Sequence, residues 1–283
     1  MKKLLMISYS YPPANAPAAQ RAYFFAKYLT EWNKVVITAE KFDSSLGSSA
    51  WAKQPDDTII LRTKNIDMSL YRKAKDEKAF GQSAEGERKS SSSKRSIKSR
   101  IVLFLRSLII SDKAFAWRPS AYKEALKLIK EDVTIRCILS SSPLISNHLV
   151  ASRLKRKTKL PWVADFRDFH YINVIEKNGS LFKRIINNKW EQRIINEADR
   201  VVFISESMKQ EYVRRYPEIS DKARVIHNGF DPEEYSPREE PLSRRPITIF
   251  YAGSFYGGDR DPLPLFMALD KLGEQGVITE NEV

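Results

Sequence analysis

Two carboxylates and an arginine stand close together in the segment Asp165-Phe166-Arg167-Asp168, directly after an apolar run. A carboxylate such as that of Asp168 can orient or deprotonate a hydroxyl nucleophile, which is the role of a general base. The planar guanidinium of Arg167 can bind a phosphate. The alternative is a structural ion pair between Arg167 and either Asp165 or Asp168. We treat Asp165, Arg167 and Asp168 as candidate catalytic residues.

A second cluster follows the apolar run 247–252 and precedes a helical pattern. It contains Gly253-Ser254, Gly257-Gly258 and Arg260. Glycine permits close approach of the backbone to a phosphate, and the N-terminus of the following helix favours an anion. We interpret the cluster as a diphosphate-binding loop, and the alternative is an ordinary surface loop.

Apolar runs alternate with helical patterns along the chain, which predicts a parallel, doubly wound α/β sheet. The predicted strands are residues 3–9, 35–38, 58–61, 135–139, 162–164, 200–204, 223–226 and 247–252. The predicted helices are residues 18–31, 121–130, 144–157, 181–196, a helix capped by Ser205 or Ser207, and 263–272. Ligands of such sheets bind at the carboxyl ends of the strands, so both clusters lie where ligands are expected.

Several function classes lack their sequence signatures. There is no Gly-x-Gly-x-x-Gly after the first predicted strand, no P-loop and no Gly-x-Ser-x-Gly elbow. The single cysteine, Cys137, excludes a disulfide scaffold, and three histidines do not suggest a metal site. No stretch approaches the roughly 20 apolar residues of a spanning helix, and the apolar start is too short for a signal peptide. We therefore expect no metal and a cytoplasmic location.

The positive charge is concentrated in the middle of the chain. The net charge is +13, but residues 61–200 hold 31 Lys and Arg against 15 Asp and Glu, a local net charge of +16. Residues 201–283 hold 10 basic against 15 acidic residues, which gives −5. This surplus favours an anionic partner such as a membrane surface or a phosphate-bearing molecule. The acidic last third argues against a nucleic-acid partner.

The polar segment 64–100, with four consecutive serines at 90–93, predicts a mobile insertion. Apolar residues at 97, 101, 104, 105 and 108 then share one helical stripe among basic side chains. Such a segment, 94–110, can lie at an anionic membrane interface. The alternative is an ordinary core helix with charged flanks.

Motifs along nearly the whole chain resemble those of one enzyme family, the bacterial group 1 (family four) retaining glycosyltransferases of the GT-B fold, in particular those of surface-polysaccharide biosynthesis. The motifs are Tyr11-Pro12-Pro13, Gln20-Arg21, Ser141-Ser142-Pro143, Pro161-Trp162-Val163-Ala164-Asp165-Phe166-Arg167-Asp168, Ala198-Asp199-Arg200-Val201-Val202-Phe203-Ile204-Ser205, Val225-Ile226-His227-Asn228-Gly229-Phe230-Asp231 and Phe250-Tyr251-Ala252-Gly253-Ser254. The chain departs from the family at Ser141-Ser142-Pro143, where some relatives carry a histidine.

The resemblance implies two facing Rossmann-like domains, an N-terminal one for the acceptor and a C-terminal one for the nucleotide-sugar. It implies sugar transfer with retention and no metal or cofactor beyond the nucleotide-sugar substrate. The implied acceptor-binding residues are Pro13, Gln20, Arg21, Ser141, Ser142 and His170. The implied donor-binding residues are Gly253, Ser254, Gly257, Gly258 and Arg260.

The expected domains are an N-terminal acceptor-side domain at 1–226, a linker at 227–246 and the incomplete start of a donor domain at 247–283. The family carries a pair of glutamates eight positions apart in its C-terminal domain. Glu274 and Glu282 have this spacing, but they directly follow the first helix of that domain, which is too early for the family's pair. We therefore expect the family's pair beyond these residues.

The expected function is sugar transfer from a nucleotide-sugar to a lipid-linked or polysaccharide acceptor, at the inner face of the membrane. The alternative is a non-catalytic subunit or remnant whose donor half lies on another chain.

Overall fold

The computed structural model describes residues 1–41, 53–65, 112–169, 181–234, 248–253, 255 and 260–278. The chain divides into two compact units, Met1–Gly229 and Phe230–Val283, which we describe separately. The predicted membrane segment 94–110, and nearly all of the predicted insertion 64–100, lie outside the described residues. Among the described residues, no helix has both the length and the apolar character needed to cross a bilayer.

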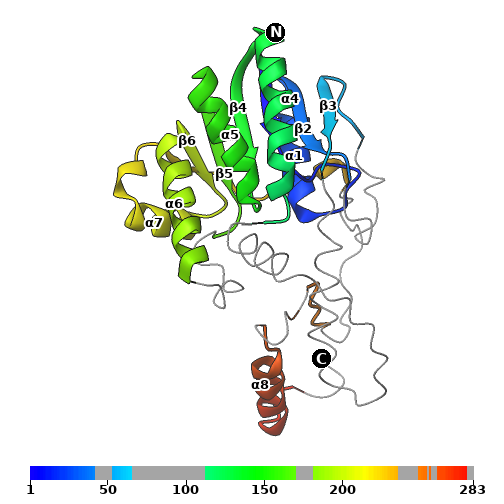
Figure 1. Cartoon of the computed structure of the whole chain (residues 1–283). Helices are drawn as coiled ribbons and strands as arrows, with labels where there is room; N and C mark the ends of the chain where they lie inside the picture. The colour runs from blue at the N-terminus through cyan, green and yellow to red at the C-terminus, as the bar shows by residue number, and fades with distance from the viewer. Residues whose placement is uncertain are drawn as a thin grey trace, which may run out of the picture. The chain divides into compact units, whose positions relative to one another are not determined.

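The first unit is built on one seven-stranded sheet (Figure 1). Its strands are β1 (Lys3–Ile7), β2 (Asn33–Ala39), β3 (Thr58–Thr63), β4 (Ile135–Ser141), β5 (Trp162–Phe166), β6 (Arg200–Phe203) and β7 (Ala223–Val225). Their order is β3-β2-β1-β4-β5-β6-β7, and every neighbouring pair is parallel. The predicted α/β class with a parallel sheet is confirmed.

Helices cover both faces of this sheet. They are α1 (Pro17–Tyr28), α4 (Arg118–Glu131), α5 (Ile145–Thr158), α6 (Leu181–Glu197) and α7 (Glu206–Arg215), with short 3-10 turns η2 (Phe115–Trp117) and η4 (Pro217–Ile219). Alternate strand residues face opposite sides. Leu4 and Met6 therefore pack in the cluster with α1, while Leu5 and Ile7 join the larger core with α4 and α5.

The order of the strands reverses beside β1. Strands β2 and β3 follow one another on one side of β1, and strands β4 to β7 follow one another on its other side. Parallel sheets bind ligands outside the carboxyl ends of strands at such a switch point. The topology therefore predicts a ligand site among the segments that follow β1, β4 and the adjacent β5.

The second unit contains a 3-10 turn, η5 (Pro232–Glu234), and one helix, α8 (Leu263–Glu274). The helix predicted at 263–272 is confirmed. The strand predicted at 247–252 is wrong over the described residues 248–252, which form no strand. A strand needs hydrogen-bonded neighbours, and the described part of this unit offers none.

Helix α7 shows how a single side chain sets a boundary. Its N-cap is Ser205, whose hydroxyl accepts a hydrogen bond from the backbone N–H of Met208 at 3.2 Å. Ser207, the other predicted cap, lies inside the helix and contacts the Ser205 hydroxyl at 3.1 Å. The cap is therefore Ser205.

Replacing Ser205 by alanine leaves the Met208 amide without its side-chain acceptor. We expect Ser205→Ala to lower the free energy of unfolding by roughly 0.5–2 kcal/mol, the usual cost of losing an N-cap. Urea denaturation measures this change, with Ser207→Ala as the control. A larger loss for Ser207→Ala than for Ser205→Ala would contradict the assignment.

Candidate functional site

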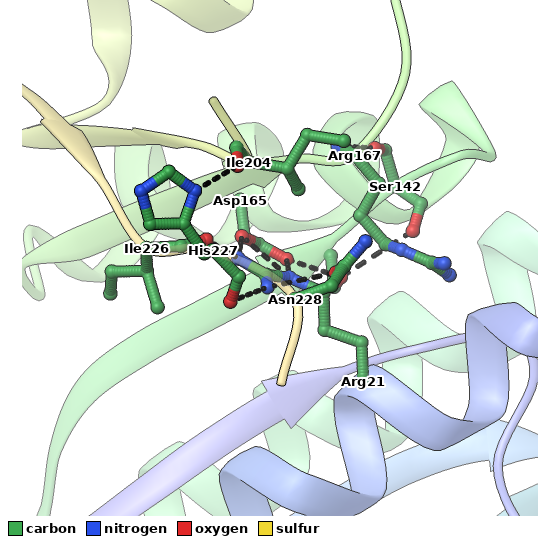
Figure 2. Close-up of polar contacts among 9 residues, drawn as sticks. Arg21, Ser142, Asp165, Arg167, Ile204, Ile226, His227 and Asn228 are labelled. Carbon is green, nitrogen blue, oxygen red and sulfur yellow. Dashed lines mark hydrogen bonds and ion pairs between the residues drawn. The ribbon is translucent and has the colours of Figure 1, made fainter. Parts of the chain in front are cut away.

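A buried ion pair lies at the carboxyl end of β5. Asp165 is 0% exposed and Arg21 of α1 is 7% exposed. The Arg21 guanidinium holds the carboxylate with two nitrogens: Nη2 donates to Oδ1 at 2.7 Å, and Nε donates to Oδ2 at 3.0 Å (Figure 2). Ser141, the last residue of β4, donates its hydroxyl to Oδ2 at 2.6 Å. The Asp165 carboxylate is thus fully engaged inside the protein.

The remaining donors of Arg21 reach the segment after β7. Nη2 donates to the carbonyl of Ile226 at 2.9 Å, and Nη1 donates to the carbonyl of His227 at 3.1 Å. Nη1 also donates to Oδ1 of Asn228 at 3.1 Å. A guanidinium has five N–H groups, and these contacts use all of them. Arg21 has no N–H left for a ligand, so the geometry favours a positioning role over its predicted contact with an acceptor.

Asp165 was predicted as a catalytic residue, and its geometry likewise favours positioning. The Asp165 carboxylate has no exposed surface in this structure, and its catalytic role stays a prediction. The structure also settles the ion pair left open by the sequence, because Asp165 pairs with Arg21 and not with Arg167. The two partners lie 144 positions apart in the chain, so sequence reasoning cannot find this pair.

Ser142 joins the ends of β4 and β5. Its backbone N–H donates to the carbonyl of Asp165 at 2.9 Å. Its hydroxyl oxygen accepts from the backbone N–H of Arg167 at 2.7 Å (Figure 2). Ser142 is buried, and its hydrogen bonds fix the position of the Arg167 backbone. Its contact with an acceptor remains a prediction.

Arg167 differs from Arg21 because its side chain has no hydrogen bond or ion pair within the described residues. Its Nε is buried without a partner. Burial lowers the pKa of Arg167, while the nearby charges of Asp168 and Asp165 raise it. An arginine stays protonated in proteins, so Arg167 is a cation whose guanidinium has no hydrogen-bond acceptor among the described residues. The adjacent Asp168 is exposed.

A small cleft lies beside Asp168. It is lined by Ser142, Pro143, Ile145, His148, Phe166, Asp168 and Phe169, and its volume is about 20 Å³. Such a space holds about one water molecule. The cleft lies at the carboxyl ends of β4 and β5, where the sequence predicts a ligand.

His148 forms one wall of this cleft, which the sequence did not indicate. Its Nδ1 lies 2.8 Å from the hydroxyl of Ser140, and that hydroxyl accepts from the indole N–H of Trp162 at 2.8 Å. Its ring stacks on Phe166 with centroids 4.7 Å apart. His148 is 1% exposed, so its ring is packed inside the unit. Ser140, a polar residue inside a buried strand, is the signal that could have indicated a side-chain partner.

The N-terminus of α5 lies at the same edge of the sheet and is already bonded. Both the backbone N–H and the hydroxyl of Ser146 donate to the carboxylate of Asp112, at 2.8 and 2.7 Å. Asp112 therefore supplies the negative charge that a helix N-terminus favours.

The other predicted residues are distributed as follows. Gln20 is exposed on α1, and Pro13 is half-buried in the loop after β1. In the second unit, Arg260 donates to the hydroxyl of Tyr251 at 2.9 Å. A Cβ at Gly253 would lie 2.7 Å from the Tyr251 ring, so glycine leaves room for that ring. His170, Ser254, Gly257 and Gly258 lie outside the described residues.

Arg260 and Tyr251 border a mostly apolar cavity of about 630 Å³ within the second unit. It is lined by Thr248, Ile249, Tyr251, Phe255, Arg260, Asp261, Pro262, Leu265, Phe266 and Leu269. Among the described residues of either unit, no group of three or more His, Cys, Asp or Glu side chains could hold a metal ion.

Comparison with known proteins places these observations in a family. The family model described as Glycosyltransferase Family 4 matches residues 79–234, more than half of the chain. The chain belongs to glycosyltransferase family 4. Membership agrees with the fold class predicted from the sequence, α/β of the GT-B type, whose Rossmann-like N-terminal sheet is described above. A second Rossmann-like domain remains a prediction.

Solved structures similar to this family 4 chain share little sequence with it. Sucrose-phosphate synthase from Thermosynechococcus elongatus has 14% identity and a TM-score of 0.49, over 84% of this chain and 51% of that one. Anabaena HepE in complex with UDP has 13% identity and a TM-score of 0.45, over 84% and 47%. Arabidopsis thaliana UGT89C1 complexed with UDP-L-rhamnose has 11% identity and a TM-score of 0.44, over 87% and 57%. The chain thus spans about half the length of these proteins. No curated protein matches it.

The Arg21–Asp165 pair yields a stability prediction. Arg21→Met leaves the Asp165 carboxylate buried without its cation, and we expect the free energy of unfolding to fall by about 3–5 kcal/mol. We expect Asp165→Asn to be similarly costly, and the double variant to cost clearly less than the sum of the two. Urea denaturation measures all three.

The matched control is Arg193→Met, which removes the exposed pair between Arg193 and Glu197 on α6. Such a surface pair contributes about 0–1 kcal/mol. Strictly additive effects of the two single variants, or an Arg21→Met loss no larger than that of the control, would contradict the coupling.

Proposed function

We propose that this chain, alone or as part of a longer protein, transfers a sugar from a nucleotide-sugar to a lipid-linked or polysaccharide acceptor, with retention, in cell-surface polysaccharide biosynthesis. The proposal is supported by two neighbouring residues, Arg167 and Asp168, in a chain that belongs to a glycosyltransferase family. Arg167 offers a guanidinium with no partner among the described residues and Asp168 an exposed carboxylate, both at the carboxyl end of β5.

The two residues would divide the recognition of the acceptor between them. Arg167 would bind an anionic group of the acceptor, such as the phosphate of a lipid-linked sugar. Asp168 would orient the acceptor hydroxyl and remove its proton as the bond to the sugar forms. Arg21 and Asp165, together with Ser141, would hold the ends of β4 and β5 in the arrangement that these roles require.

The leaving group would be stabilised by residues of the second unit. Glycosyl transfer builds positive charge on the anomeric carbon and negative charge on the departing diphosphate. Arg260 and the backbone N–H groups near Gly253 are our candidates for binding that diphosphate, with Ser254, Gly257 and Gly258. This chemistry uses no metal and no cofactor beyond the nucleotide-sugar substrate.

Arg167 provides the decisive test. Loss of a hydrogen bond to a charged group costs about 1.5–3 kcal/mol, so we expect Arg167→Ala to raise the KM for a phosphate-bearing acceptor by roughly 10- to 150-fold. The KM for the nucleotide-sugar should remain near the wild-type value. Steady-state kinetics with radiolabelled donor measure both. The matched control is Arg136→Ala, which removes an exposed arginine near the amino end of β4. An unchanged acceptor KM in Arg167→Ala would contradict the proposed role.

Asp168 is tested by the turnover rate. We expect Asp168→Asn, which keeps the size of the side chain but not its basicity, to lower kcat by about 10²–10⁴-fold with little change in the donor KM. An unchanged kcat would exclude Asp168 as the base. A wild-type chain that binds acceptor but transfers no sugar from any nucleotide-sugar would favour the alternative of a non-catalytic subunit.

We also propose peripheral contact with the inner face of the cell membrane, through residues 94–110. The support is the local charge of +16 across residues 61–200 and the apolar stripe flanked by basic side chains. We expect the chain to float with vesicles containing phosphatidylglycerol and not with vesicles of phosphatidylcholine alone. Deletion of 94–110 should abolish flotation, and undiminished flotation of the deletion variant would overturn the proposal.

A further inference from the structure

The short segment that leaves the sheet after β7 has little side-chain burial. Ile226, His227 and Asn228 are all exposed, and the compact first unit ends at the next residue, Gly229. Exposed side chains gain little from packing, so hydrophobic burial does not fix this segment. Its order depends on polar contacts.

Most of these contacts come from one side chain. The Ile226 N–H continues the strand pairing by donating to the carbonyl of Phe203 at 2.9 Å. Arg21 binds the carbonyls of Ile226 and His227 and Oδ1 of Asn228 (Figure 2). The imidazole Nδ1 of His227 adds a contact of 2.9 Å with the carbonyl of Ile204. Among the described residues, Arg21 is therefore the only side chain that bonds to all three positions.

Arg21 is itself held firmly. Its bidentate pair with Asp165 lies in the protein interior, where a charge is stable only if it is paired and fully hydrogen-bonded. Its guanidinium also lies over the ring of Phe25, 4.9 Å from the centroid. A rigid, planar fork of donors thus faces the segment after β7.

We propose that Arg21, braced by Asp165, clamps the last residues of the first unit, so that residues 226–228 stay ordered beyond the end of β7. Arg21 is then a positioning residue. It fixes the point from which the chain leaves the acceptor-side unit towards the proposed donor-side unit. This clamp does not require the proposed glycosyl transfer, and it can be tested without an activity assay.

A lysine variant at position 21 separates the ion pair with Asp165 from the hydrogen bonds to residues 226–228. Lysine at position 21 can still neutralise the Asp165 carboxylate, but its single nitrogen cannot reproduce the planar fork. Arg21→Lys should therefore retain the fold and lose the bonds to the segment. Asn228→Ala removes one bond from the segment side and leaves the ion pair intact.

Backbone order parameters from 15N relaxation test the clamp in the full 283-residue chain. In the wild type we expect order parameters of about 0.85 at the amides of residues 226–228, as in a rigid backbone. In Arg21→Lys they should fall below about 0.6, while β1 and β4 keep their wild-type values. In Asn228→Ala the fall should be confined to residues 227 and 228.

The control is Lys34→Met, which breaks another ion pair, between the buried Lys34 of β2 and the half-buried Asp57. It should lower stability without changing the order parameters at 226–228. The clamp is overturned if these residues are already mobile in the wild type. It is also overturned if Arg21→Lys and Asn228→Ala, both folded, keep wild-type values, or if Lys34→Met mobilises the segment equally.

Discussion

The buried ion pair between Arg21 and Asp165 is the constraint on which the carboxyl edge of the sheet depends. Removing two charges from water is costly, and the pair is stable only because every donor and acceptor around it is satisfied. Asp165 needs Ser141 as well as Arg21, and Arg21 needs the oxygens of Ile226, His227 and Asn228. The requirement to satisfy one pair therefore fixes the ends of β4, β5 and β7 together.

Arg21 and Arg167 consequently differ in their bonding at this edge, although the sequence does not distinguish them. Arg21 lies inside the edge and is committed to internal partners. Arg167 follows β5, with its backbone N–H bonded to Ser142 and its side chain without a described partner. Since both arginines lie near the switch point of the sheet, the distinction between a positioning cation and a binding cation comes from burial and bonding, not from residue type.

The parts of the fold that could be predicted are those decided by local sequence. The seven strands of the first unit are apolar runs because both faces of a doubly wound sheet are covered, and Ser205 is recognisable as a cap. The strand expected at 247–252 has the same apolar pattern, but pairing decides whether a strand forms, and pairing is not local. Candidate site residues were found by their position after strands. The partner of Asp165, and the cleft wall formed by His148, depend on contacts between distant segments and could not be found in this way.

Three of the groups at the described part of this edge could hold an anion: Arg21, the N-terminus of α5 and Arg167. Asp165 neutralises the first, and Asp112 occupies the second through Ser146. Both neutralising carboxylates belong to the protein, so neither group can attract a ligand strongly, because the field of each is cancelled within a few ångströms. Among the described residues, the negative charges that act on Arg167 are the exposed Asp168 and the shielded Asp165. Under the proposed function, an anionic acceptor would therefore be drawn to Arg167, beside Asp168, the exposed carboxylate of the Asp165–Asp168 segment that we propose as the base.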